Sequence, residues 1–486
     1  MGSVGDKTAT ATFWTVIEKV GNVGVLFVVS MILARLLTPH DYGVIAILLV
    51  FISIGQVFVD SGFGKALIRK LDCSNLDYST AFFFNLSVAV LSYILLFLAA
   101  PYIACFYNLD ILTSVLRVYG FALILNALTI VHIAIITQQL AFRSMAKCRI
   151  LSNTISGGIA ILLAYKGFGV WALVAQTLLD SFFFMLFLMV STQWRPSFNI
   201  SRVSFSYLWQ FGSKMLLSGL ISSVYSNLYP LIIGKIYSKD DLGYYNRGWS
   251  LSSLIPGVIS SSFGKSTYPI LCQYQNNHDA LLALFRKYTQ LISFLTFPII
   301  VLTAVLAKPL ILLVLTDKWE GAIFYIQVFS LAALTGPIGV VNLNLLMALG
   351  RSDYMLKADV IKKTVGILVI IIIVPFGIKT IAIGSAAIEI YIYVVNAYFA
   401  KKAIGVPYLI QIKDFMPYLL ASLFMGGMVY MIILMIESLI LQLFIGSIMG
   451  GLTYLFITKY VVRSPYNGVL LNMINERMKS IFISHE

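Results

Sequence analysis

The sequence predicts an all-α polytopic membrane protein with about fourteen transmembrane helices, arranged as two parallel six-helix lobes followed by two extra C-terminal helices. Three observations predict this class. The chain is 59% hydrophobic and only 11% charged, whereas about a quarter of the residues in a soluble domain are charged. Apolar runs of the length that crosses a bilayer follow one another along the whole chain. One long stretch also occurs twice.

Each apolar run is expected to be a helix, because lipid offers no hydrogen-bond partner to the backbone and an open strand would leave its polar groups unpaired. A helix needs about 20 residues to cross the bilayer, and the runs have lengths near this value. The predicted spans are 13–37, 42–60, 79–100, 114–138, 149–166, 170–192, 206–236, 243–263, 288–307, 321–349, 358–376, 379–400, 415–436 and 439–460.

The chain carries a net charge of +14, and the positions of its basic residues explain most of that excess. With the N-terminus in the cytoplasm, Lys and Arg gather in inner segments such as 65–70, 143–149 and 351–363 and are sparse in the outer ones. The positive-inside rule then predicts an even number of helices and two cytoplasmic termini. The charge thus indicates topology and not nucleic-acid binding. The cysteines and histidines are scattered, so we predict neither a metal site nor a disulfide framework.

The duplicated stretch is 33–65, which recurs as 233–265 without a gap. A match of this length indicates an internal repeat, so the protein consists of two copies of one unit. The residues that are identical at matched places are Asp41, Gly43, Ser53, Ser61, Phe63, Gly64 and Lys65. Further matches outside this stretch extend each unit to six helices.

An even number of helices brings both units into the membrane from the same side, which makes the repeat parallel, with its axis along the membrane normal. We therefore expect an N-terminal lobe at 1–200 and a second lobe at 201–405. The remaining segment, 406–486, is expected to contain two additional helices and a cytoplasmic tail. The outer loops are short and leave no room for an extracytoplasmic domain.

Five motifs carry a family resemblance. They are Trp14–Lys19, Leu33–Gly43, Asp60–Ile68, Asp241–Arg247 and Leu312–Trp319. In these motifs the sequence closely resembles the Wzx-type polysaccharide exporters, which are lipid-linked oligosaccharide flippases of the multidrug/oligosaccharidyl-lipid/polysaccharide (MOP) exporter superfamily. The resemblance covers nearly the whole chain. Arg247 is not diagnostic, because relatives vary at the position after the paired tyrosines.

The resemblance implies two lobes in a V, a central cavity and transport by alternating access. It also implies a cargo, an undecaprenyl-pyrophosphate-linked oligosaccharide that moves from the cytoplasmic to the periplasmic leaflet of the bacterial inner membrane. Such cargo serves the biosynthesis of lipopolysaccharide O-antigen, capsule or exopolysaccharide, with other polysaccharide assembly proteins as partners. No cofactor is expected.

Charged residues inside the predicted spans are the first candidates for a binding site, because a charge at mid-membrane costs about 2.5–3.5 kcal/mol on insertion scales. Glu18 and Lys19 lie in the first helix, and Lys214 lies in the seventh. One interpretation places Lys19 and Lys214 opposite each other across the cavity, where they attract the pyrophosphate. The other lets both side chains snorkel to the cytoplasmic interface. Glu18 either neutralises Lys19 or titrates during transport.

The seventh helix has a polar face. Lys214, Ser218, Ser222, Tyr225 and Tyr229 recur at spacings of three or four residues, so they share one side of a helix. A lipid-facing helix would not hold such a stripe, which favours a water-filled cavity. The alternative is that the serines are small residues that allow close helix packing.

Four cations at predicted helix ends complete the candidate binding residues. Arg35 and Lys235 end the first helix of each unit on the outer side. They either receive phosphate or complement the negative end of a helix and pair with a nearby aspartate. Lys65 and Lys265 lie at the cytoplasmic ends of the second helices, where a lipid-linked anion would first arrive. They are otherwise ordinary positive-inside charges.

Further charges are weaker candidates. Arg247 lies near the outer membrane depth and could contact the cargo. Asp180 and Glu389 lie in the sixth and twelfth helices, and with Glu18 they are candidates for binding a coupling ion, a proton or sodium. Pairing between helices is the other interpretation of both acids. The membrane potential is an alternative source of energy, since the cargo carries negative charge.

Two other functions compete with flipping. A drug/cation antiporter of the same superfamily needs carboxylates in its cavity, whereas the intramembrane charges here lean basic. A polysaccharide polymerase needs acid and base groups on a sizeable external loop, and the outer loops are short. We therefore expect a transporter and not an enzyme.

Overall fold

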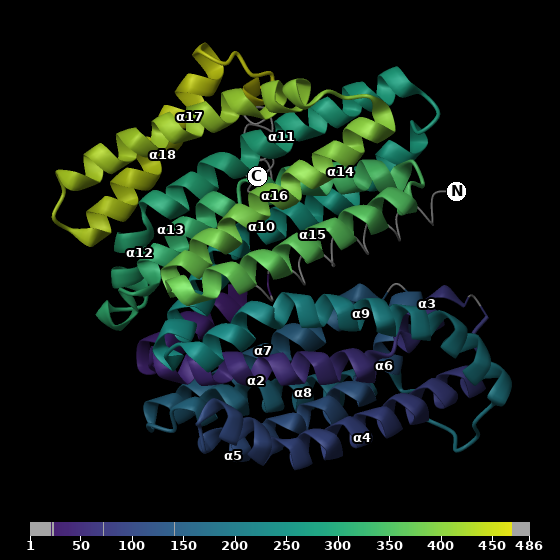
Figure 1. The fold of residues 1–486 in the computed structure, drawn as a ribbon. Coiled ribbons are helices and arrows are strands. Elements are labelled where there is room, and N and C mark those ends of the chain that lie inside the picture. Colours follow the sequence, from purple (N-terminus) through teal and green to yellow (C-terminus); the bar gives the residue numbers. More distant parts are fainter. Residues whose placement is uncertain (1–20, 22–23, 71, 140, 469–486) are drawn as a thin grey trace, which may run out of the picture. The chain divides into compact units, whose positions relative to one another are not determined.

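The computed structural model describes residues 21, 24–70, 72–139 and 141–468, except for the side chain of Lys265. Within that part of the chain every regular element is a helix, so the predicted all-α class is confirmed (Figure 1). The chain divides into two compact units, Met1–Gly243 and Tyr244–Glu486, each with its own core. The lobe boundaries near residues 200 and 405 stay a prediction.

Unit 1 contains the helices up to the start of α10. A helical stretch at Gly24–Leu36 comes first. The others are α2 (Pro39–Asp60), α3 (Phe63–Arg69), α4 (Asn75–Tyr107), α5 (Ile111–Gly120), α6 (Ala122–Gln138), α7 (Phe142–Tyr165), α8 (Val170–Thr192), α9 (Arg202–Ile236) and the first turn of α10 (Lys239–Gln273). In sequence α9 opens the second repeat, yet it packs against α2, α3 and α4 of this unit.

Two helices of unit 1 begin at capping boxes, which explains where they start. At α2 the Thr38 hydroxyl accepts a bond from the Asp41 amide, and the Asp41 carboxylate accepts one from the Thr38 amide. Ser74 and Asp77 make the same exchange at α4. Each pair satisfies backbone donors that the first turn of a helix leaves without a partner.

Unit 2 contains the rest of the chain. Its further elements are α11 (His278–Val305), α12 (Ala307–Val314), η1 (Asp317–Trp319), α13 (Ala322–Ala332), α14 (Thr335–Ala348), α15 (Ser352–Ile373), η2 (Val374–Phe376), α16 (Ile378–Ile404), α17 (Tyr408–Leu434) and α18 (Leu439–Tyr460). Phe294 of α11 packs with Tyr418, Tyr454 and Tyr466, so the two last helices join one aromatic core with α11.

The helices make this a multi-pass membrane protein. Eleven helices of the described residues are long and apolar enough to cross a bilayer, and Gly24–Leu36 is a shorter apolar helix. The predicted spans 243–263 and 358–376 fall on α10 and α15, which are helical but are not among those eleven. The count of fourteen therefore stays a prediction.

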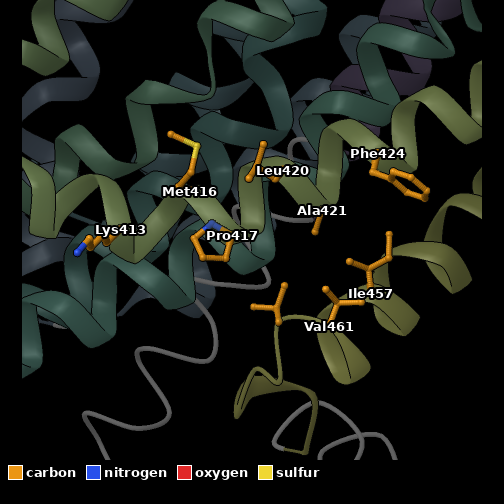
Figure 2. A pocket seen from close by; sticks show the side chains of 9 residues that line it. Lys413, Met416, Pro417, Leu420, Ala421, Phe424, Ile457 and Val461 are labelled. Atoms are coloured by element: carbon orange, nitrogen blue, oxygen red, sulfur yellow. The ribbon is translucent and has the colours of Figure 1, made fainter.

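An apolar groove of about 790 Å³ runs between α17 and α18 (Figure 2). Its lining consists of Lys413, Met416, Pro417, Leu420, Ala421, Phe424, Ile457, Val461 and Val462. Only Lys413 of this lining is charged, and it is exposed. Such a surface suits contact with acyl chains, with the lysine close to a headgroup region.

Replacing Asp414 tests the attachment of α17 to α11. Its carboxylate is 2% exposed and accepts bonds from Arg286 Nε and Nη2 at 3.0 Å and from Gln290 Nε2 at 2.8 Å. Asp414→Ala leaves these donors unpaired, and we expect a loss of about 1–3 kcal/mol. Thermal unfolding of the purified protein in detergent measures the loss. Asp353→Ala, which removes an exposed pair with Arg351, is the control and should change little. Equal melting temperatures for both variants would contradict the expectation.

Candidate functional site

A polar cavity of about 320 Å³ lies in unit 1, where the end of α2 and the start of α3 face the first half of α9. The lining consists of Gln56, Val57, Asp60, Gly62, Lys65, Met215, Leu216, Ser218, Gly219 and Ser222. Asp60 and Lys65 are the charged members of this lining. The site therefore combines a carboxylate, an ammonium group, an amide and two hydroxyls within the helix bundle.

The turn between α2 and α3 gives the cavity its floor. Ser61 and Gly62 both have left-handed backbones, with φ of 44° and 71°, which end α2 after Asp60 and separate it from α3. A side chain at Gly62 would be strained at this φ, and its Cβ would lie 2.7 Å from that of Met215. Gly62 thus allows both the turn and the close approach of α9.

On α9, Gly212 also allows the two segments to approach closely. A Cβ on Gly212 of α9 would lie 2.6 Å from the carbonyl oxygen of Ser61 and 2.8 Å from the Phe63 ring. Phe63 is fully buried and stacks on Phe84 of α4 at 4.5 Å. Since α9 and α4 both hold the start of α3, the position of Lys65, two residues after Phe63, is set by packing.

A polar seam continues from the cavity along α2. The Gln56 side chain accepts a bond from Asn126 of α6 at 3.0 Å. One turn earlier, Ser53 accepts bonds from Asn227 of α9 at 2.9 Å and from Ser223 at 3.5 Å. Polar side chains inside a membrane bundle bond across helices because lipid offers them no partner.

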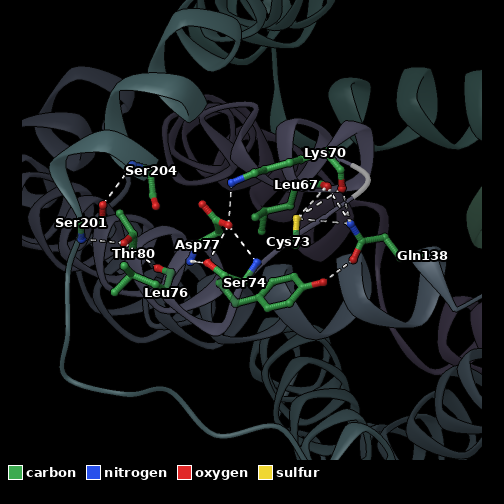
Figure 3. Close-up of polar contacts among 11 residues, drawn as sticks. Leu67, Lys70, Cys73, Ser74, Leu76, Asp77, Thr80, Gln138, Ser201 and Ser204 are labelled. Carbon is green, nitrogen blue, oxygen red and sulfur yellow. Dashed lines mark hydrogen bonds and ion pairs between the residues drawn. The ribbon is translucent and has the colours of Figure 1, made fainter.

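A second polar network holds the segment before α9 in place (Figure 3). The Ser201 amide donates to the Thr80 hydroxyl at 3.0 Å, and Ser201 in turn caps α9 by accepting from the Ser204 amide. Lys70 pairs with the buried Asp77 at 2.7 Å. The start of α4 therefore positions the helix that carries the cavity serines.

Hydrogen bonds from Gln138 cap the C-terminal end of α3. Gln138 of α6 donates to the carbonyl oxygens of Leu67 and Lys70 at 2.8 and 3.1 Å, and it also contacts the Cys73 sulfur and the Tyr78 hydroxyl (Figure 3). These bonds satisfy the last carbonyls of α3. The short helix that carries Lys65 is thus held at both ends.

The structure brings together three of the predicted binding residues, Lys65, Ser218 and Ser222, in this cavity. Lys214 and Tyr225 lie on α9 one turn before and one turn after these serines, outside the lining. Their binding role stays a prediction.

Several predicted residues lie where the structure says nothing of their side chains. Glu18 and Lys19 are outside the described residues, so the pairing of Lys19 with Lys214 across a cavity also stays a prediction. Lys265 lies on α10, but its side chain is not described.

The outer cations have surroundings of their own. Arg35 is exposed at the end of the helix Gly24–Leu36. The Lys235 ammonium donates to the carbonyl oxygen of Phe106 and lies 4.2 Å from its ring centroid. Phe106 is in the last turn of α4, so Lys235 complements the negative end of that helix.

Arg247 belongs to unit 2 and is 6% exposed. Its guanidinium lies 5.8 Å from the centroid of Trp319, which ends the short helix η1. Arg247 therefore packs on an aromatic residue in a different unit from the cavity.

Two of the three candidate coupling acids, Asp180 and Glu389, lie beside cations of neighbouring helices. Asp180 of α8 accepts from the Ser152 hydroxyl of α7 at 2.7 Å and from Arg149 at 3.4 Å. Glu389 of α16 is within electrostatic reach of Lys362 on α15. Among the described residues no group of three or more potential ligands could hold a metal ion.

Sequence reasoning missed Gln56 and Asp60, although Asp60 lies in a motif that was noted. One signal was available, because the internal repeat places Ser260 at the position that matches Asp60. A carboxylate in one copy and a hydroxyl in the other marks a position where the two units differ in chemistry.

Comparisons with known proteins agree with this architecture. Residues 32–324 match the model of a family described as polysaccharide biosynthesis protein. The teichuronic acid biosynthesis protein TuaB of Bacillus subtilis is 23% identical over 409 residues, which cover 83% of this chain and 85% of TuaB. The lipopolysaccharide biosynthesis protein WzxC of Escherichia coli is 22% identical over 370 residues, 74% of each chain. A solved structure of the lipid II flippase MurJ in an inward closed conformation has a TM-score of 0.75 at 14% identity, covering 93% of this chain and 99% of that one.

The family match covers more than half of the chain and includes α2, α3 and α9, which form the cavity. The MurJ structure shares the fold. The predicted resemblance is therefore confirmed, and the chain belongs to the polysaccharide biosynthesis protein family.

Proposed function

We propose that this protein flips undecaprenyl-pyrophosphate-linked oligosaccharide repeat units from the cytoplasmic to the periplasmic leaflet of the bacterial inner membrane by alternating access. It acts as a transporter and not as an enzyme, with both termini in the cytoplasm. The observation that carries the proposal is the polar cavity with Lys65 at its edge and the hydroxyls of Ser218 and Ser222 in its wall.

The groups of the cavity suit a diphosphate. A lysine ammonium supplies charge to phosphate oxygens, and hydroxyl groups supply further donors. Lys65 of α3 and Ser218 of α9 are both exposed in the cavity lining, so both are accessible to a ligand. A volume of about 320 Å³ is at the low end of small-molecule sites. It suits a diphosphate with its nearest sugar, while the rest of the glycan and the lipid tail stay outside.

The position of the cavity fits the leaflet from which such cargo starts. Lys65, Arg69 and Lys70 follow the end of α2, and basic residues mark the cytoplasmic side. A lipid-linked anion in the inner leaflet would therefore meet Lys65 at the depth of its own headgroup. The names of TuaB and WzxC, which refer to teichuronic acid and lipopolysaccharide biosynthesis, support a glycan as cargo.

One observation favours a second candidate function. The Asp60 carboxylate lines the same cavity, and a cavity carboxylate is what a drug/cation antiporter of this superfamily needs for a cationic cargo. Lys65 and Asp60 therefore point to opposite cargo charges. Their replacement, one at a time, separates the two functions.

Lys65→Ala should lower export of the lipid-linked glycan by about tenfold or more, because a hydrogen bond to a charged group contributes about 1.5–3 kcal/mol. Lys65→Arg should retain most of the activity. The measurement is complementation of a deletion strain, with lipid-linked repeat units quantified in each leaflet and protein levels checked in the membrane.

Lys166→Ala removes an exposed cation that is not part of the cavity lining, and it serves as the matched control. The proposed function predicts finished repeat units that accumulate on the cytoplasmic leaflet when Lys65 is replaced. Unpolymerised units exposed on the periplasmic leaflet would instead support a polymerase, and normal export by Lys65→Ala would remove the role of this residue.

The membrane potential should accelerate flipping. The cytoplasm is electrically negative, so outward movement of a negative charge is favourable. For about two charges the free energy released is roughly 4–5 kcal/mol per 100 mV, at about 2.3 kcal/mol per charge. Valinomycin with external potassium, at a constant pH gradient, should therefore slow transfer of the labelled cargo in vesicles. An unchanged rate would exclude the potential as the energy source and leave a counter-moving proton or sodium ion, with Asp180 and Glu389 as the acids to replace.

A further inference from the structure

Asp60 differs in its surroundings from Asp180 and Asp414, two other acids that lie within helices. Asp180 pairs with Arg149, and Asp414 pairs with Arg286. Asp60 forms no ion pair or hydrogen bond with the part of the chain that the structure describes, and the charge that acts on it there is Lys65. Its carboxylate lines the cavity in which the cargo diphosphate is proposed to bind.

The fold gains little from a charge at this position. Asp60 is the last residue of α2, and the C-terminal end of a helix carries partial negative charge, which disfavours a carboxylate. Ionised groups inside membrane helices are also costly and usually mark a functional site. The turn after α2 does not need the acid either, because its special backbone conformations belong to Ser61 and Gly62.

The internal repeat supports the same conclusion. The second copy retains Ser261, Phe263, Gly264 and Lys265 at the matched places but has Ser260 where the first copy has Asp60. A serine is therefore acceptable before the Phe-Gly-Lys sequence in a related helix. Of the two copies, only the first has a carboxylate at this position. It places a negative charge near Lys65, whereas the matching Lys265 has no acid at that position.

We propose that Asp60 is the counter-ion that Lys65 exchanges for the diphosphate of the cargo. This inference rests on the proposed function and adds a role for the acid within the same cavity. In the empty cavity the Asp60 carboxylate attracts the Lys65 ammonium electrostatically, although the two groups form no ion pair. When the diphosphate binds Lys65, the two negative groups repel each other, and the diphosphate is held less tightly.

Weak binding has a purpose in transport, because a site must capture its cargo and also release it. A cavity with Lys65 and two hydroxyls but no acid would retain the anion and slow each cycle. Asp60 therefore lowers the affinity for the cargo and raises the rate of each transport cycle. A purely structural acid has no such signature, because its loss would lower binding and transport together.

The test uses full-length protein in lipid nanodiscs and inorganic pyrophosphate as the probe in calorimetric titrations. Asp60→Ser installs the residue that the second copy already contains, which favours a folded variant. We expect it to bind pyrophosphate about tenfold more tightly than the wild type, because a like charge is removed from the site. The same change made together with Lys65→Ala should give a much smaller gain, since the lysine no longer holds the anion.

Transport supplies the second readout, with labelled lipid-linked glycan in the complementation strain. Asp60→Ser should export cargo several-fold more slowly although it binds the anion more tightly. Asp353→Ser removes an exposed acid of unit 2 and controls for net charge, so it should leave both quantities unchanged. Pyrophosphate binding by Asp60→Ser that equals or falls below that of the wild type overturns the inference while the proposed function stands. If Lys65→Ala does not weaken pyrophosphate binding, the proposed role of Lys65 in binding the cargo and the inference about Asp60 both fail.

Discussion

The close packing of α9 on the turn between α2 and α3 is the constraint on which the candidate site depends. Gly62 and Gly212 bring two backbones within the distance that a single Cβ would occupy. This contact forms one wall of the cavity from α9 and the opposite wall from Asp60 and Lys65. A larger side chain at either glycine would separate the helices, because neither backbone can give way as a flexible side chain can.

Polar groups inside the bundle are held by one another and not by lipid. Ser53, Gln56, Asn126 and Asn227 form bonds between α2, α6 and α9, and they continue directly into the cavity. Each of these hydrogen bonds is favourable, because the alternative is an unpaired polar group in hydrocarbon. The seam therefore provides both cohesion of the bundle and a polar surface next to the place where an anionic headgroup is proposed to bind.

Much of the fold is predictable because membrane helices obey strong local rules. The apolar runs had to become helices, and the capping pairs Thr38 with Asp41 and Ser74 with Asp77 mark helix starts that their spacing alone makes recognisable. The site was predicted only in part. Periodicity placed Ser218 and Ser222 on one face of α9, but Lys214 continues that face in sequence and lies outside the cavity lining.

The sequence by itself determined the helical class, the internal repeat, the membership in the polysaccharide biosynthesis protein family and the basic character of Lys65, since these depend on composition and on residues close together in the chain. Only the tertiary structure decided which side chains share the cavity. Ser222 is distant in sequence from Gln56 and Asp60, and their meeting depends on a left-handed turn and on the glycine contact with α9. Periodicity describes the faces of one helix, whereas a cavity forms only where several helices pack together.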